Sequence, residues 1–290
     1  MDYFLHILVI MTVYTTLAVS LDLLAGHTGL LSIAHAAFYG IGAYCSAILA
    51  VSFGLGFMLS TVCGILMAAL VSFVVSFPSL RLHDDYFVIA TFGFQFILFS
   101  IFNNWMGVTR GPLGIPGIPE PVIFSWKVDS HIEFLAFGSA FAALAIIVAN
   151  RLSSSPFGRV LRTIREDEVL ARSLGKNTLY FKVAVFAVSA ALAASAGCLY
   201  AHYITYIDPT SFSMMESILV ISMVIIGGAG SKWGPVIGAV VLVILPEALR
   251  FIGMPSSVAA NMRQVFYGAL FVIMMMFRPR GLVGKYGFER

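Results

Sequence analysis

Long apolar runs separated by short polar stretches make up most of this 290-residue sequence. Most of these runs are close in length to the roughly 20 residues that a helix needs to cross a membrane. A membrane β-barrel would alternate apolar and polar positions over segments of about ten residues, and the sequence has no such pattern. We therefore predict an all-α, polytopic membrane helix bundle with about eight or nine transmembrane segments. The apolar runs lie near residues 4–25, 30–53, 56–77, 86–105, 132–150, 180–203, 215–228, 235–252 and 264–277.

The second and seventh runs are rich in glycine, and we expect them to be broken or re-entrant. The stretches "GIGAYCSAIL" (40–49) and "VIGAVVLVIL" (236–245) align loosely, and a glycine-rich break precedes each. Paired glycine-interrupted segments indicate the binding region of many transporters. Close packing of small residues between helices explains such glycines equally well. The candidate pathway residues are Gly26, Gly29, Ser32, His35, Phe38, Gly40, Gly42, Tyr44, Thr91, Gly93, Gly227, Gly228 and Gly230.

Polar residues at membrane depth usually face the interior of a bundle. His35 suits an interhelical hydrogen bond somewhat better than a solute contact. Asp22 and Glu247 lie near the ends of the first and eighth runs, far apart in the pattern, which favours helix-end anchoring over a proton relay.

The composition agrees with a membrane protein. Hydrophobic residues make up 60% of the chain and charged residues 11%, whereas soluble domains are about 25% charged. We treat residues 1–290 as a single transmembrane domain. The N-terminus lacks the basic region and cleavage site of a signal peptide, so we expect it to form the first membrane helix. The cysteines lie inside apolar runs without metal-ligand spacing, which is typical of small packing residues.

Basic residues fall mainly on one side of the predicted bundle. If all the runs cross, 13 of the 17 Lys and Arg residues lie on one side and 4 on the other. The side rich in basic residues is the cytoplasmic one. We therefore expect the loop at about 151–180 and the C-terminus to be cytoplasmic, and the N-terminus to be external. The external connection 106–131 is rich in Pro and Gly and is expected to form an irregular, ordered cap.

One densely charged segment, "SPFGRVLRTIREDEVLARSLG" at 155–175, interrupts the apolar pattern. Ser155 suits an N-cap, Pro156 the first helical position, and Gly175 the position past the helix end. The segment is therefore predicted to be one short amphipathic helix. Its apolar stripe consists of Phe157, Val160, Leu161, Ile164, Ala171 and Leu174.

The pattern of this helix is compatible with three roles. It suits an interfacial helix on anionic lipid headgroups, a connector without a partner, or a helix that docks in a groove on a cytoplasmic protein. The acidic run at 166–168 favours docking, because a lipid-binding helix gains nothing from it.

The sequence has no motif that carries catalysis. A phosphate-binding G-x-x-x-x-G-K-[ST] motif is absent, because the pairs Gly175–Lys176 and Gly284–Lys285 lack both the spacing and the hydroxyl. The histidines have no zinc spacing, and no nucleophile–base pair is visible. We therefore expect no catalytic residue and no metal or other cofactor in this chain.

Six stretches, spread along almost the whole chain, resemble one family. The charged segment and the following "FKVAVFAVSAALAASAGCLYA" closely resemble the cytoplasmic coupling loop and next helix of the branched-chain amino-acid ABC importer permeases, and within them the LivM branch. The other similar stretches are "GHTGLLSIAHAAFYGIGAY" (26–44), "LRLHDDYFVIATFGF" (80–94), "TRGPLGIPGIP" (109–119), "SILVISMVIIGGAGSKWGPVIGAVVLVILPEALR" (217–250) and "FRPRGLVG" (277–284).

The resemblance implies an inner-membrane transport subunit without enzymatic activity. Its expected partners are a second homologous permease, two cytoplasmic ATP-binding subunits that hold ATP and Mg²⁺, a periplasmic or lipid-tethered solute-binding protein, and membrane lipid; no nucleic acid is expected. The charged loop would fit a cleft in an ATP-binding subunit. The residues expected to couple to it are Phe157, Gly158, Arg159, Arg162, Ile164, Arg165, Glu166, Ala171, Leu174 and Gly175.

The cargo implied is a branched-chain or other hydrophobic amino acid. Leu30 and Ala34 depart from the family's usual glutamine and glycine, so urea, short amides or aromatic acids remain alternatives as cargo. A stand-alone secondary transporter or channel is a further alternative, but it would need no mixed-charge docking helix.

Overall fold

The computed structural model is a helical bundle whose long helices coincide with the predicted apolar runs. It describes residues 2–79, 84–123, 126–128, 130–251, 256–278 and 280–284. The long helices are α1 (Asp2–Thr28), α2 (His35–Phe53), α3 (Phe57–Ser79), α4 (Asp84–Asn104), α6 (His131–Ser154), α9 (Thr178–Ile204), α10 (Met214–Gly227), α11 (Gly234–Phe251) and α12 (Ser256–Phe277). Within the described ranges, α1 to α4, α6 and α9 are long and apolar enough to cross a membrane. The prediction of an all-α membrane bundle is therefore confirmed.

Both glycine-rich runs are interrupted, as predicted. The second run becomes helical only at His35, because residues 29–34 between α1 and α2 are not helical. The seventh run, α10, ends at Gly227, and residues 228–233 form a second non-helical break before α11. Thus α2 and α11 each follow a glycine-containing break.

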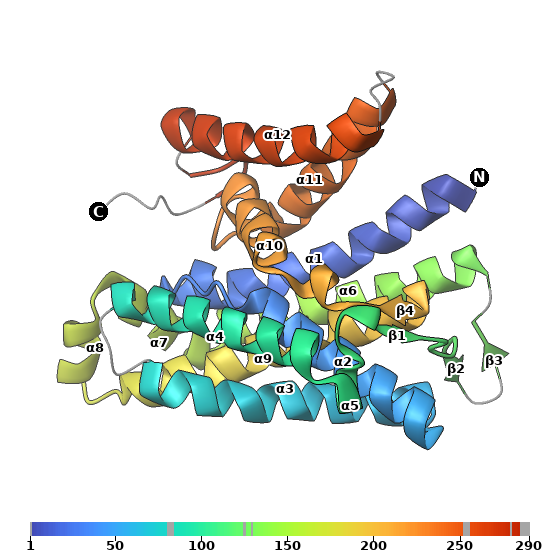
Figure 1. Ribbon diagram of the computed structural model, residues 1–290. Helices are drawn as coiled ribbons and strands as arrows, with labels where there is room; N and C mark the ends of the chain where they lie inside the picture. The colour runs from blue at the N-terminus through green and yellow to red at the C-terminus, as the bar shows by residue number, and fades with distance from the viewer. Residues whose placement is uncertain are drawn as a thin grey trace.

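Helices α1, α2 and α9 form the centre of the bundle (Figure 1). In the most apolar 18-residue stretch of each of these helices, 67% is buried inside the bundle. The corresponding share in α3, α4 and α6 is 22–28%. The peripheral helices expose large apolar side chains such as Leu66, Ile97 and Leu144. Such faces suit lipid, because hydrocarbon is as apolar as these side chains.

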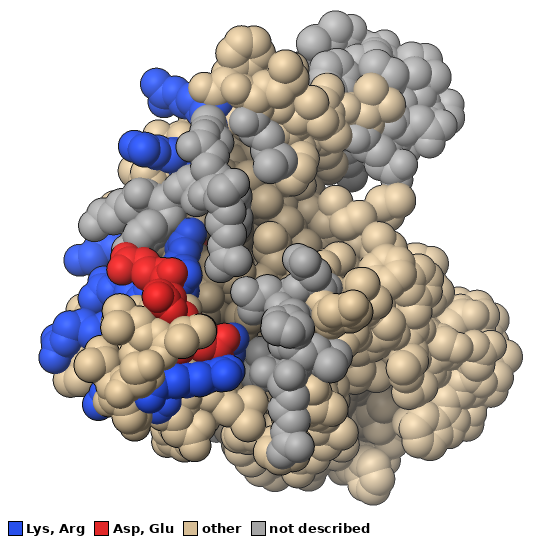
Figure 2. All heavy atoms as spheres, turned by 90° about the vertical axis from the view of Figure 1, so that its left-hand side faces the viewer, with Lys and Arg blue, Asp and Glu red and all other residues tan. Residues whose placement is uncertain are grey.

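Charged side chains gather at one end of the bundle. The short helices α7 (Pro156–Glu166) and α8 (Glu168–Ser173) lie at one end, and the N-terminus lies at the other (Figure 1). Lys, Arg, Asp and Glu gather over the end that holds α7 and α8, whereas most of the remaining surface on this face carries no charge (Figure 2).

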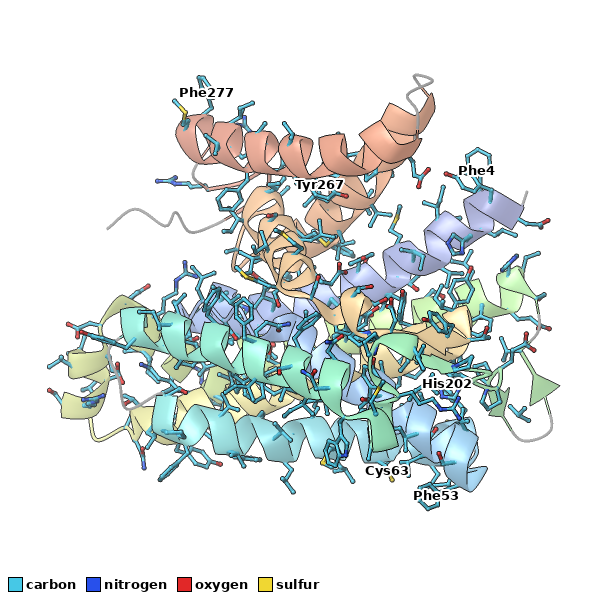
Figure 3. All side chains as sticks on the ribbon, in the orientation of Figure 1. Phe4, Phe53, Cys63, His202, Tyr267 and Phe277 are labelled. Atoms are coloured by element: carbon cyan, nitrogen blue, oxygen red, sulfur yellow. The ribbon has the colours of Figure 1, made fainter. Side chains whose placement is uncertain are left out.

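Apolar side chains also project from helix ends at the surface. Phe4, Phe53 and Phe277 point away from the bundle, whereas His202 points inward (Figure 3). His202 is buried; its Nδ1–H donates a hydrogen bond to the Pro119 carbonyl at 2.7 Å, and its Nε2 is hydrogen-bonded to Ser46 Oγ at 2.8 Å. It thereby ties α2, α9 and the connection after α4 together.

The connection between α4 and α6 is an irregular cap, as predicted, where the structure describes it. It contains α5 (Met106–Thr109), η1 (Gly111–Leu113), β1 (Ile115–Pro116), β2 (Val122–Ile123) and β3 (Trp126–Lys127). Strand β1 pairs antiparallel with β4 (Tyr206–Ile207), and β2 pairs with β3. Because β4 leads into η2 (Pro209–Phe212) and α10, the cap fixes where α10 begins.

Candidate functional site: the charged end, the helix breaks and a membrane cavity

The charged segment forms two helices rather than the one that we predicted. Helix α7 ends at Glu166, and Asp167 adopts an extended conformation with φ −156° and ψ 104°. The Asp167 carboxylate accepts a hydrogen bond from the Leu170 N–H at 2.9 Å and so caps α8. Aspartate favours such caps over helix interiors, because its side chain competes for backbone hydrogen bonds. The predicted ends are confirmed: Ser155 caps α7, and Gly175 follows α8 with φ +75°.

The apolar face of α7 packs against the helix bundle itself. Leu161 and Ile164 are buried within the bundle, and the Phe157 ring lies 5.0 Å from that of Phe181 on α9. Gly158 is also buried, and a Cβ there would lie 2.3 Å from the Ser153 carbonyl oxygen. Ile164, one of the residues expected to couple to an ATP-binding subunit, is only 4% exposed, because the bundle itself covers this face.

A different set of apolar residues is exposed at this end. Val169, Leu170 and Leu174 on and after α8 have relative exposures of 72%, 51% and 65%. Ala171 is buried beneath them, and the exposed charges Arg159 and Glu166 lie on α7. Leu174 is among the predicted coupling residues, whereas Val169 and Leu170 are not, because the prediction of one continuous helix did not place them on its apolar stripe.

An ion-pair cluster fixes α8 to α9. Glu168 accepts hydrogen bonds at 2.8 Å from both Lys182 on α9 and Arg172 on α8. Burial raises the pKa of the Glu168 carboxyl, but the hydrogen bonds from Lys182, Thr178 and Arg172 outweigh it, so the pKa lies below its ordinary value. The acidic run thus stabilises the position of α8, which places the exposed apolar residues.

Arg165 connects α7 to α1. Its guanidinium donates a hydrogen bond to the Gly26 carbonyl near the C-terminal end of α1. Cations favour helix C-termini, where carbonyl groups lack intrahelical partners. A polar cavity of about 350 Å³ adjoins this contact and is lined by Gly29, Arg165, Glu166 and neighbouring residues.

The break between α1 and α2 is held by polar side chains from other helices. Thr91 accepts a hydrogen bond from the Ile33 N–H at 3.2 Å, and Ser217 on α10 accepts one from the Ala36 N–H at 2.9 Å. Ser32 accepts one from the Ala34 N–H. His35 forms the interhelical hydrogen bond that we expected, with Ser20 on α1 at 2.7 Å. Non-helical backbone at membrane depth requires such partners inside the protein.

The predicted pathway glycines have several environments. A Cβ at Gly42 would lie 2.2 Å from the Ala194 carbonyl oxygen of α9, and one at Gly227 would lie 1.9 Å from the Gly234 carbonyl oxygen. These two are close-packing positions. At Gly40 the nearest atoms belong to the Phe102 and Phe212 rings, and Gly93 has no such atom within 4 Å.

Two predicted pathway aromatics lie in the core of the bundle. Phe38 contacts the rings of Phe94 and Phe186 at 5.5 and 5.3 Å, and Tyr44 stacks on Phe102 at 4.5 Å. These residues form an aromatic layer between α2, α4 and α9.

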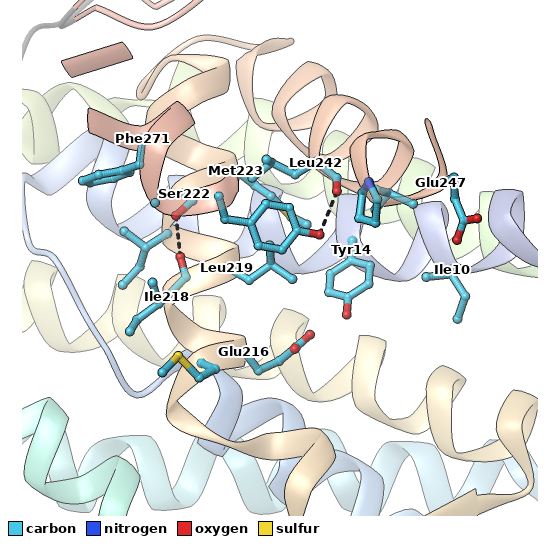
Figure 4. Close-up of a pocket in the computed structure, with 16 residues that line it drawn as sticks. Ile10, Tyr14, Glu216, Ile218, Leu219, Ser222, Met223, Leu242, Glu247 and Phe271 are labelled. Atoms are coloured by element: carbon cyan, nitrogen blue, oxygen red, sulfur yellow. Dashed lines mark hydrogen bonds between the residues drawn. The ribbon is translucent and has the colours of Figure 1, made fainter. Parts of the chain in front are cut away.

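A cavity of about 490 Å³ lies between α1, α10, α11 and α12 (Figure 4). Its wall is mainly aliphatic and aromatic, and its polar groups include the carboxylates of Glu216 and Glu247 and the hydroxyl of Tyr14. Its volume lies within the range of about 300–1,000 Å³ that is usual for small-molecule sites. None of the predicted pathway residues is among the described residues that line this cavity. A carboxylate in the first turn of an otherwise apolar helix, at Glu216, was the sequence signal that we missed.

The remaining chemistry is limited in the part of the chain that the structure describes. It contains no group of three or more His, Cys, Asp or Glu residues placed to hold a metal ion. The three cysteines are free.

Comparison with known proteins identifies the family. The sequence model of the family described as "Branched-chain amino acid transport system / permease component" matches residues 3–275. No solved structure matches the chain.

Three relatives cover most of the sequence. The high-affinity branched-chain amino acid transport system permease protein LivM of Escherichia coli (strain K12) is 34% identical, over 93% of this chain and 68% of the relative. The LivH permease protein of the same organism and system is 26% identical, over 96% of this chain and 93% of the relative. A probable branched-chain amino acid transport permease LivM of Methanocaldococcus jannaschii is 26% identical, over 76% of this chain and 67% of the relative. The chain therefore belongs to the family of branched-chain amino acid transport system permease components.

Proposed function

We propose that this permease is the membrane subunit of an ATP-driven importer and that α8 is the main contact for a partner ATPase. The observation that carries the proposal is the exposed apolar group Val169, Leu170 and Leu174, held in place by the Glu168 ion pairs. Exposed apolar residues rimmed by charge are typical of protein–protein interfaces. Arg159 and Glu166 supply charges that orient a partner.

The assembly that we propose contains two permeases, two ATPases and a solute-binding protein. The presence of LivM and LivH permease proteins in one Escherichia coli transport system supports a second, homologous permease. ATP and Mg²⁺ would bind the ATPases, which leaves this chain with transport alone and no catalytic step of its own.

The orientation that we propose places α7, α8 and the C-terminus in the cytoplasm of a cell with this permease in its inner membrane. The concentration of charge at this end supports it, because basic residues follow the cytoplasmic side (Figure 2).

The cargo that we propose is an aliphatic amino acid, and the cavity between α1, α10, α11 and α12 lies on its route. The names of the relatives and the chemistry of the cavity support this cargo. The aliphatic wall, with Leu219, Met223 and Leu242, suits a branched side chain, and the Glu216 and Glu247 carboxylates suit an ammonium group. Urea and short amides offer no apolar body to such a wall.

Two measurements on the purified, reconstituted complex test the function. For docking, Leu174→Asp and Val169→Asp are compared with Leu113→Asp, because Leu113 is a similarly exposed leucine (73%) at the opposite end of the bundle. We expect the two α8 variants to lose co-purifying ATPase and Leu113→Asp to retain it. Full ATPase retention by both α8 variants would refute docking through α8.

For cargo, uptake of leucine, isoleucine and valine into vesicles is compared with uptake of urea and of an aromatic acid. We expect ATP-dependent uptake of the aliphatic amino acids, reduced by Glu216→Gln. Preferred uptake of urea or of the aromatic acid would overturn the cargo and leave the docking result standing.

A further inference from the structure

Asp22 lies where α1 meets the break between α10 and α11. The residue is 5% exposed and lies near the C-terminal end of α1. Its Oδ1 accepts a hydrogen bond from the backbone N–H of Gly230 at 2.7 Å. A carboxylate therefore holds the break against α1 at a buried position, where an unmade hydrogen bond is costly.

Gly26, one turn further along α1, leaves room for this bond. A Cβ at Gly26 would lie 2.2 Å from Asp22 Oδ1 and 2.5 Å from the Gly230 nitrogen. The Gly26 carbonyl also accepts the hydrogen bond from Arg165 of α7. The same turn of α1 thus contacts both α7 and the break.

The break has the torsions and the supports of a hinge. Gly228 and Gly230 have φ values of +107° and +72°, which glycine adopts with little strain. Backbone N–H groups of Leu282 and Val283 donate to the carbonyls of Ile226 and Gly227 at 2.9 and 3.0 Å. The C-terminal segment 280–284 therefore braces the end of α10, while Asp22 holds the break itself.

We propose that Asp22 is a positioning residue of the transport cycle. Its hydrogen bond to Gly230 couples a displacement of α7 to a movement of the break between α10 and α11. The proposal rests on the proposed docking of an ATPase at α7 and α8. A displaced α7 moves α1 through Arg165 and Gly26, and Asp22 passes the movement to Gly230. A small displacement can break and remake the single hydrogen bond between Asp22 and Gly230. It cannot separate helices whose backbones pack closely, such as α2 and α9.

The test compares substitutions that remove the acceptor with one that keeps it. Asp22→Leu has a similar shape but no acceptor, and Asp22→Asn keeps an Oδ1 acceptor without the charge. Gly26→Ala leaves Asp22 in place and inserts a methyl group into the bond. Gly107→Ala is the control for the glycine change, because no heavy atom outside its own surroundings lies within 4 Å of a Cβ there.

The measured quantity is leucine taken up per ATP hydrolysed by the complete complex in vesicles. Allosteric coupling between sites is usually worth about 5- to 150-fold. We expect Asp22→Leu and Gly26→Ala to lower the ratio by about fivefold or more while ATPase still co-purifies, because the bond transmits movement and does not hold the subunits together. Asp22→Asn and Gly107→Ala should stay within about twofold of the wild-type ratio, well below the usual range of coupling.

The outcomes separate this proposal from the function on which it rests. A wild-type complex without ATP-dependent uptake refutes the proposed function. A wild-type ratio in Asp22→Leu or Gly26→Ala, in a complex that transports, refutes the role of Asp22 alone. Equal loss in Asp22→Asn and Asp22→Leu would assign the effect to charge and would also overturn the proposal. If Asp22→Leu does not fold, Gly26→Ala still decides.

Discussion

A close contact between α2 and α9 in the centre of the bundle allows a quantitative test of the packing. Gly197 on α9 faces the backbone of α2, and a Cβ there would lie 2.0 Å from the Tyr39 carbonyl oxygen and 2.9 Å from the Ala43 nitrogen. Ordinary contacts begin at 3.4 Å, so Gly197→Ala forces two helix backbones apart by more than 1 Å. No flexible side chain can move aside, because both nearest atoms belong to the backbone.

The magnitude follows from two opposing effects. Alanine improves helix propensity over glycine by up to about 1 kcal/mol. Overpacking of a well-packed interior costs about 1–3 kcal/mol, and rigid backbone on both sides places this site at the upper end. We therefore expect Gly197→Ala to lower the free energy of unfolding by about 1–2 kcal/mol. The same change at Gly93, with no atom within 4 Å of a Cβ, should be neutral or stabilising.

Thermal unfolding of the purified protein, followed by the loss of its helical signal in one detergent, checks this pair. We expect the midpoint of Gly197→Ala to fall by several degrees and that of Gly93→Ala to remain or rise. An unchanged midpoint for Gly197→Ala would refute the close approach of α2 and α9. Transport by Gly93→Ala adds a second result: reduced uptake at unchanged stability would support a pathway role for that glycine.

Three further predictions concern the charged end and the orientation. Leu161→Ala removes a fully buried side chain between α7 and the bundle. Denaturation of the purified subunit should therefore show that the free energy of unfolding falls by about 2–5 kcal/mol. Glu168→Gln leaves the buried Lys182 ammonium without its carboxylate, and protease digestion should cut the 166–177 region faster than in wild type. The pKa of Glu168 is below its ordinary value of 4.5, so the ion pair stabilises the position of α8 fully above pH 4.5. The wild type should become as sensitive to protease as Glu168→Gln only when the pH falls through the lowered pKa of Glu168. A cysteine at the exposed Ser154 should react with a charged reagent from the cytoplasm and one at the exposed Ser130 from outside, and the reverse labelling would invert the proposed orientation.

The helices could be predicted from the sequence because membrane spans depend on run length and hydropathy, which are local properties. Gly29 and Gly228 indicated the two breaks correctly. Both residues have positive φ angles, which glycine adopts easily and other residues rarely do, so the residue type alone indicates where the helix can end. The division between α7 and α8 was missed because Asp167 fits a helix surface and a helix cap equally well in a pattern. Only the extended torsions at that residue decide between the two.

The orientation of the apolar stripe was beyond a sequence argument for a related reason. Ile164 and Leu174 have the same character in the sequence, yet one packs on the bundle and the other is exposed, because the turn at Asp167 rotates α8 relative to α7. A periodic pattern shows that a helix has an apolar face without showing what covers it. In a membrane subunit with a cytoplasmic partner, two apolar surfaces compete for that face: the subunit's own bundle and the partner. Here the bundle takes the face of α7, and the ion pairs of Glu168 hold α8 so that its apolar residues stay exposed. The part of the charged segment that remains exposed for an ATPase is therefore α8, and the position of α8 depends on the ion pairs of Glu168.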